Sequence, residues 1–126
     1  MNLLLDTHVF LWAIDNHPNL SPKAREAIED GNNLVFVSAA TAWEISIKKS
    51  IGKLKLPNGD YLQELKVHRF TPLDITATHA LAIEQLPPYH KDPFDRMLIA
   101  QAQIEKLTVV TRDERIKAYN VSVIET

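Results

Sequence analysis

Short apolar runs alternate with stretches of helical spacing along the chain, and this alternation restricts the fold more than any other feature. The predicted strands cover residues 3–5, 34–37, 69–71, 107–111 and 121–124. The predicted helices cover residues 7–14, 21–30, 38–51, 60–66, 76–85 and 92–102. Strands that alternate with helices are typical of βαβ units, whose strands lie parallel in one sheet. The chain is therefore predicted to be an α/β protein with a mostly parallel central sheet.

The length of 126 residues suits one domain, so residues 1–126 are predicted to fold as a single unit. With 45% hydrophobic residues, 24% charged residues and no cysteine, the chain is globular and has no disulfide or thiolate metal site. The apolar N-terminal stretch contains Asp6 and His8 and follows no basic segment, which argues against a signal peptide or a membrane span. We expect a cytoplasmic protein that binds no membrane.

Capping and turn residues mark the ends of several predicted helices. Ser38 and Asp92 are predicted N-caps, and Gly52 is predicted to end the helix that starts after Ser38. A turn is predicted at 57–59. The helix after Ser38 carries large apolar residues on one side, namely Trp43, Ile47 and Ile51.

Four acidic residues are expected at the carboxyl edge of the sheet, where parallel strands end and the returning helices begin. Asp6 follows the first strand, and Asp113 lies two residues after Thr111 at the end of a later one. Asp95 lies in the first turn of a helix, and Glu44 about two turns into another. Acids brought together raise one another's pKa unless a cation neutralises them, and hard oxygen ligands favour Mg²⁺ or Mn²⁺. Such an ion could hold a phosphodiester and activate water for in-line attack.

Each acid also has a purely structural interpretation. Asp6 could cap the helix that follows it, and Asp95 could complement the dipole of its helix. Glu44 could be an exposed partner of Lys48, one helical turn away. Asp113 could be a solvated acid in a turn.

Other polar residues give weaker signals. Thr7 and Thr111 flank the acids and could orient a water molecule, and Arg96 and Arg112 could contact phosphate. A net charge of −2 excludes nucleic-acid binding by overall charge, although residues 44–69 carry an excess of bases. The histidines show no metal-ligand spacing and are predicted to have surface or structural roles: His8, His17, His68, His79 and His90.

Four segments carry a resemblance to a known family: Leu-Leu-Leu-Asp-Thr-His at 3–8, then residues 38–45, 92–102 and 109–113. In order and spacing they closely resemble the PIN-domain family, and within it the VapC-type toxins of type II toxin–antitoxin systems. The resemblance covers essentially the whole chain. It implies a three-layer α/β/α domain and a metal-dependent endoribonuclease.

The resemblance also implies roles for individual residues. The acidic positions of the family, which are catalytic and bind Mg²⁺ or Mn²⁺, fall on Asp6, Glu44, Asp95 and Asp113. Asp6 and Asp95 match the most direct metal ligands. The supporting hydroxyl positions match Thr7 and Thr111. RNA contacts are expected at basic residues, with Lys48, Lys49, Lys53, Arg96 and Arg112 as the candidates.

Partners follow from the resemblance as well. An RNA substrate is implied, together with a homodimer and a cognate VapB-like antitoxin. The antitoxin is expected as a separate protein, because no DNA-binding segment is recognised here, and its C-terminal segment would insert an arginine among the acids.

Three alternatives remain open on the sequence alone. One is a non-catalytic RNA- or protein-binding module of the same fold. Another is a phosphotransfer domain with Asp6 as the acceptor, although His8 stands where a second aspartate belongs. The third is a DNA-directed relative of the flap nucleases, against which the lack of a DNA-clamping segment counts.

Overall fold

The computed structural model describes residues 1–56 and 59–126, so the predicted turn at 57–59 lies outside the described residues except for Gly59. The strands are β1 (Asn2–Leu5), β2 (Leu34–Ser38), β3 (Thr71–Leu73), β4 (Thr108–Thr111) and β5 (Ser122–Glu125). The helices are α1 (Thr7–Ile14), α2 (Pro22–Glu29), α3 (Ala39–Ser50), α4 (Tyr61–Val67), α5 (Ala77–Ala82), the 3₁₀ helix η2 (Ile83–Gln85), α6 (Pro93–Glu105) and α7 (Glu114–Lys117).

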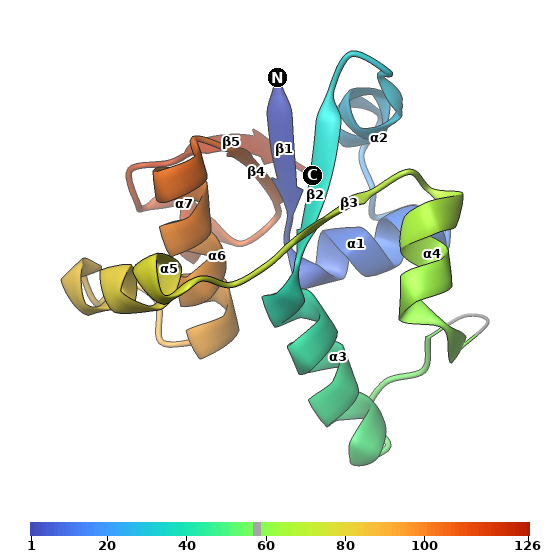
Figure 1. Ribbon diagram of the computed structural model, residues 1–126. Coiled ribbons are helices and arrows are strands. Elements are labelled where there is room, and N and C mark those ends of the chain that lie inside the picture. Colours follow the sequence, from blue (N-terminus) through green and yellow to red (C-terminus); the bar gives the residue numbers. More distant parts are fainter. Residues whose placement is uncertain (57–58) are drawn as a thin grey trace.

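The strands form one sheet in the order β3-β2-β1-β4-β5. Each neighbouring pair is parallel, so the prediction of a mostly parallel sheet holds for all the described strands. At the centre, Leu4 lies opposite Phe36 on β2 and Val109 on β4. Because the strands run in one direction, their carboxyl ends meet at one edge, which Figure 1 shows where β1 leads into α1 and β2 into α3.

Two hydrophobic clusters lie on the two faces of this sheet, as expected where successive strand residues point to opposite sides. Leu3 and Leu5 belong to the cluster under α1, α2 and α4, whereas Leu4 belongs to the cluster under α5, α6 and α7. Figure 1 shows these two groups of helices on opposite sides of the strands. The three-layer α/β/α architecture predicted from the sequence is therefore confirmed.

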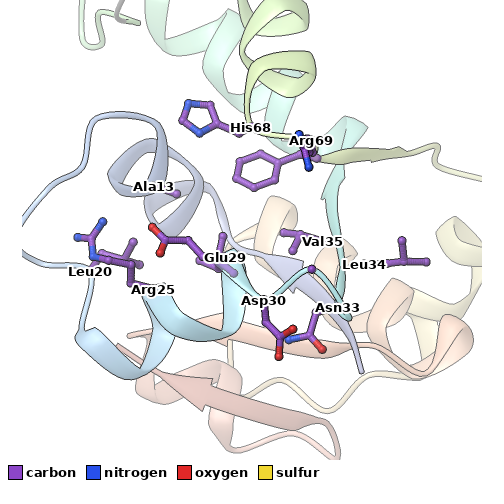
Figure 2. Close-up of a pocket in the computed structure, with 13 residues that line it drawn as sticks. Ala13, Leu20, Arg25, Glu29, Asp30, Asn33, Leu34, Val35, His68 and Arg69 are labelled. Atoms are coloured by element: carbon purple, nitrogen blue, oxygen red, sulfur yellow. The ribbon is translucent and has the colours of Figure 1, made fainter.

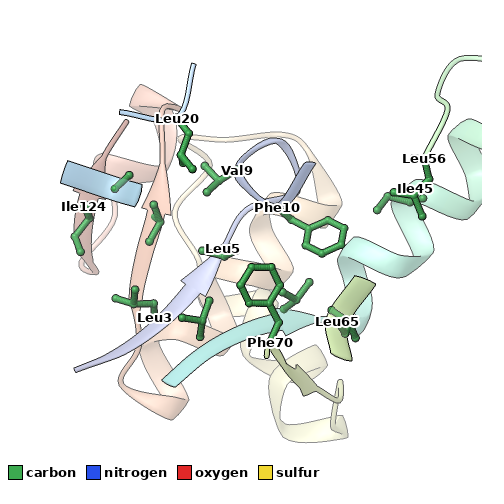
Figure 3. Close-up of a cluster of buried hydrophobic side chains, with 14 residues drawn as sticks. Leu3, Leu5, Val9, Phe10, Leu20, Ile45, Leu56, Leu65, Phe70 and Ile124 are labelled. Atoms are coloured by element: carbon green, nitrogen blue, oxygen red, sulfur yellow. The ribbon is translucent and has the colours of Figure 1, made fainter. Parts of the chain in front are cut away.

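The cluster under α1 fixes the start of that helix (Figure 3). Phe10 is fully buried, with its ring centroid 5.3 Å from that of Tyr61 and 6.1 Å from that of Phe70. Burial of one such side chain contributes about 2–3 kcal/mol. This anchoring holds Asp6, which caps α1, at the end of β1.

The structure differs from the prediction in the segment around β3. The strand begins at Thr71 rather than at residue 69, because Arg69 adopts a left-handed backbone (φ 59°) where α4 ends. Pro72 is tolerated in β3 because this strand lies at the edge of the sheet. The predicted helix 76–85 is divided into α5 and η2, and the short helix α7 was not predicted, because four residues are too few to show a period.

The apolar side of α3 faces outward. Its large residues are exposed: Trp43 at 59%, Ile47 at 41% and Ile51 at 59%. The opposite side packs inward through Ala40, Thr41, Glu44 and Ile45. Gly52, with φ 71°, ends the helix as predicted. Among the described residues, no helix is both long and apolar enough to cross a membrane.

Candidate functional site

A cleft of about 480 Å³ lies at the carboxyl edge of the sheet and receives all four predicted acids. They come from four separate segments: the end of β1, the middle of α3, the first turn of α6 and the N-cap of α7. The cleft is lined by Asp6, Thr7, His8, Trp12, Glu44, Lys48, Asp92, Asp95, Arg112, Asp113 and Arg115.

Asp6 is 5% exposed, and both of its carboxylate oxygens accept hydrogen bonds. The Val9 N–H donates to Oδ1 over 2.8 Å, which makes Asp6 the N-cap of α1. The Thr111 hydroxyl donates to Oδ2 over 2.5 Å. The capping role and the place in the cleft therefore occur together in this residue.

Glu44 is buried at 6% exposure, so the alternative interpretation of an exposed acid is wrong, although the pair with Lys48 that it included does form. The Lys48 Nζ lies 2.8 Å from Oε2, and the Thr7 hydroxyl donates to Oε1 over 2.8 Å. The Thr41 hydroxyl lies 3.1 Å from that of Thr7. These partners compensate the burial of a carboxylate on the inner side of α3.

Asp95 and Asp113 both contact the same nitrogen of one imidazole ring, that of His90. The Nε2 of His90 lies 2.9 Å from Oδ2 of Asp95 and 2.9 Å from Oδ2 of Asp113. Donor atoms of these three residues lie within 4.8 Å of one another, a spacing compatible with a metal ion. The sequence predicts only a surface or structural role for His90, but its ring lies among the acids of the cleft and is 3% exposed.

Burial and mutual repulsion shift the pKa values of two of the acids. Burial raises the pKa of Asp6, and the charge of Asp113 adds to this effect, while the Thr111 hydroxyl opposes it. Burial raises the pKa of Asp95 to about 7; the charges of Asp92, Asp6 and Glu44 add to the rise, and His90 opposes it. A cation bound among these carboxylates would relieve both effects.

Two of the five predicted RNA-contacting basic residues line the cleft, and the other three do not. Lys48 and Arg112 line the cleft, with Arg112 donating to the carbonyls of Thr126 and Asn19. Lys49 lines a different pocket, beside α3 and α4, and Lys53 is exposed after Gly52.

The guanidinium of Arg96 points away from the cleft lining and into the chain before α6. It donates to backbone carbonyls and to one phenol, the partners being Ile83, Leu86, Pro87, His90 and Tyr119. Its side chain therefore ties this segment down and is not available to phosphate.

Sequence reasoning missed six residues of the cleft and its support, namely His8, Trp12, Thr41, His90, Asp92 and Arg115. For His90 a signal was present, because it lies two residues before the N-cap Asp92 of the helix that carries Asp95. The spacing of paired histidines does not reveal a single histidine that pairs with acids.

Comparisons with known proteins identify a family for the chain. The PIN domain family matches residues 3–121. The chain is 32% identical over 120 residues to Ribonuclease VapC22 of Mycobacterium tuberculosis, covering 93% of this chain and 91% of that protein.

Solved structures show the same fold. VapBC2 of Rickettsia felis, bound to a promoter DNA fragment, aligns with a TM-score of 0.74 at 21% identity, covering 99% of this chain and 98% of that chain. DNA-bound VapBC of Salmonella typhimurium aligns with a TM-score of 0.73 at 21% identity over the same shares. FitAcB of Neisseria gonorrhoeae aligns with a TM-score of 0.60 at 25% identity, covering 97% and 96%. With four acids in one cleft and a family match over nearly its whole length, the chain belongs to the PIN domain family.

Proposed function

We propose that this protein is a metal-dependent endoribonuclease and the toxin of a toxin–antitoxin pair, with residues 1–126 acting as one PIN domain. The observation that carries the proposal is the convergence of four carboxylates from four separate segments in one cleft. The 32% identity to a protein named as a VapC ribonuclease supports the activity. The likeness to toxin–antitoxin complexes supports the biological role.

The donor set fits a hard divalent cation. Asp6, Glu44, Asp95 and Asp113 offer carboxylate oxygens, the ligands that Mg²⁺ and Mn²⁺ prefer. Burial is the main cause of the raised pKa of Asp95, and the negative charges of Asp92, Asp6 and Glu44 add to it, so a nearby cation would favour the ionised carboxylate. When bound, the cation supplies positive charge that lowers the pKa of a water nucleophile and neutralises the phosphodiester.

Hydrogen bonds within the chain orient the carboxylates of this site. Thr111 and the Val9 N–H hold both oxygens of Asp6, so that its carboxylate has one orientation. Thr7 does the same for one oxygen of Glu44. An acid with a pKa near 7, as at Asp95, can hold or release a proton at neutral pH.

Basic side chains would contact the RNA. Lys48 and Arg112 line the cleft and would bind phosphates next to the scissile bond. Lys49 and Lys53 lie outside the cleft and would contact only a longer RNA.

The proposed partners follow the complexes that this fold resembles. A separate VapB-like antitoxin would cover the cleft and place a positive charge among its acids. A homodimer would cover exposed apolar side chains such as Trp43 and Ile51 on α3. RNA as the substrate and a separate antitoxin both suit a protein of the cytoplasm.

The test is cleavage of a mixed pool of cellular RNA by the purified protein with Mg²⁺ or Mn²⁺. Cutting should disappear with EDTA and in Asp6→Asn and Asp95→Asn, whereas Glu26→Gln, an exposed acid on α2, should cut like wild type. A folded wild type that binds RNA without cutting it would overturn the proposal in favour of a non-catalytic binding module. Light scattering on the purified protein tests the homodimer separately.

A further inference from the structure

We propose that His90 is a positioning residue of the metal site: its Nε2–H donates to Asp113, lies within 2.9 Å of Asp95, and holds the two carboxylates at the separation that a divalent cation requires. The proposal rests on the metal-dependent function proposed above. Two short distances carry it, each of 2.9 Å from Nε2 to an Oδ2.

A hydrogen bond to the second ring nitrogen, Nδ1, determines the tautomer of His90. The backbone N–H of Asp92 donates to Nδ1 over 3.2 Å, and a ring nitrogen that accepts a hydrogen bond carries no proton. A neutral imidazole then has its proton on Nε2, which faces Asp95 and Asp113. Nε2 is consequently a donor to Asp113 that also contacts Asp95, and a protonated Nε2 has no lone pair to offer a metal ion.

The backbone of His90 is also anchored. Its N–H donates to the Tyr119 hydroxyl over 3.0 Å, and its carbonyl accepts from Arg96 Nη1 over 3.2 Å. The Tyr119 hydroxyl in turn donates to the carbonyl of Pro87. With its ring buried and both backbone groups paired, His90 has a single available orientation.

The two acids retain acceptor capacity for a cation. Each carboxylate offers about four lone pairs, and the Nε2 of His90 contacts only the Oδ2 of each. The other oxygen of Asp113 accepts from the Arg115 N–H over 2.8 Å, whereas no described residue donates to Oδ1 of Asp95. Donors that orient ligating groups in this way typically contribute about 10–100-fold to metal affinity.

The first experiment measures Mn²⁺ binding by calorimetry on the full chain, with no RNA present. The amide nitrogen of His90→Gln reaches the position of Nε2, whereas His90→Asn ends near the position of Nδ1 and cannot reach both acids. We expect Mn²⁺ to bind about 10–100-fold more weakly to His90→Asn and within about 3-fold of wild type to His90→Gln. Circular dichroism confirms that both variants are folded.

The second measurement needs no variant. In ¹⁵N-labelled wild type, nitrogen shifts of the His90 ring report its tautomer, and we expect the Nε2–H form to persist when Mg²⁺ is added. A ring that loses its Nε2 proton on Mg²⁺ binding would make His90 a ligand and overturn the positioning role, even if the variants did not fold.

The remaining outcomes separate this inference from the proposed function. Equal or tighter Mn²⁺ binding by His90→Asn, or equally weak binding by both variants, overturns the role of His90 alone. A wild type that binds no Mn²⁺ and cuts no RNA overturns the metal site and the positioning role together.

Discussion

Charged side chains line a pocket at each edge of the sheet, but the two pockets differ in how firmly those side chains are held. The cleft at the carboxyl edge measures about 480 Å³, and the pocket at the amino edge, where β2 and β3 begin, about 370 Å³ (Figure 2). In the cleft, Asp6 and Glu44 are buried with both oxygens hydrogen-bonded. At the amino edge, Glu29 and Asp30 come from the end of α2 and are exposed.

Helix polarity explains the difference. The helices α1, α6 and α7 begin at the carboxyl edge, and their free N–H groups are capped by Asp6, Asp92 and Asp113. The helices α2 and α4 end near the other pocket, where free carbonyls need donors, and backbone N–H groups such as that of Phe70 supply them. Helix starts therefore orient Asp6, Asp92 and Asp113 at the carboxyl edge. At the amino edge Asp30 caps no helix start, and among the described residues its carboxylate accepts only from the N–H of Asn32 in the turn that follows α2.

The largest expected effect is on the rate of RNA cleavage, which should depend on the acids of the carboxyl edge and not on those of the amino edge. Glu44→Gln and Asp113→Asn should each lower RNA cleavage at least about 100-fold, because metal-ion stabilisation is worth several kcal/mol. Glu29→Gln and Asp30→Asn at the amino edge should cut at the wild-type rate. Initial rates on one RNA with Mg²⁺ make the comparison, and a comparable loss at both edges would contradict it.

The next effect is on stability and depends on pH. The pKa of Asp95 is about 7 in the folded protein against 3.8 for a free aspartate, so the folded state binds the proton more tightly. The resulting stabilisation is fully present below pH 4 and is lost as the pH rises through 7. In EDTA at pH 8, Asp95→Asn should be more stable than wild type by about 2 kcal/mol, since a one-unit difference in pKa corresponds to about 1.4 kcal/mol and solvent screens part of it.

Urea unfolding at pH 8 and pH 4 measures this difference, which should nearly vanish at the lower pH. Asp15→Asn, an exposed acid at the end of α1, should show no such dependence. A stabilisation of the same size at both pH values would show that ionisation of the buried Asp95 is not its cause.

The sequence was sufficient to place the acids, because βαβ alternation brings strand ends and helix starts to one edge. It could not choose between a cap and a site residue for Asp6, because this carboxylate caps α1 and lines the cleft at once. Asp113, considered as a turn acid or a site residue, lines the cleft and also caps the unpredicted helix α7. For Glu44 it was wrong about burial, because the large apolar residues beside it lie on the exposed side of α3.

Side-chain contacts between segments that are distant in the chain could not be predicted from sequence spacing. His90 and Asp113 are 23 residues apart, and only the packing of the chain before α6 against α7 brings them together. The side chain of Arg96 follows the same pattern, since its position in the sequence suggests phosphate and its partners in the structure are carbonyls. Spacing along one element is a local property, whereas these roles depend on tertiary contacts.

A smaller effect tests how the cleft holds its acids. Thr7→Val keeps the shape of the side chain but removes the donor to Oε1 of Glu44. We expect a loss of about 1 kcal/mol, at the low end for a buried unpaired acceptor because Lys48 still pairs with the other oxygen. Urea unfolding measures it, with the exposed Thr78→Val as the matched control. If both variants unfold like wild type, the carboxylate does not depend on this hydroxyl.

The smallest effect concerns RNA affinity and bears on whether RNA reaches only one edge. Arg115 is exposed and lines the cleft, whereas Arg69 is exposed at the amino edge. In an Asp6→Asn background that binds without cutting, Arg115→Ala should weaken RNA binding a few-fold and lower the salt dependence by about 0.7 in log–log slope, the value for one phosphate contact on a single strand. Arg69→Ala should change neither quantity. If Arg69→Ala lowers the slope equally, RNA extends across both edges, and the amino-edge pocket contributes charge to binding although its acids are not held in place for catalysis.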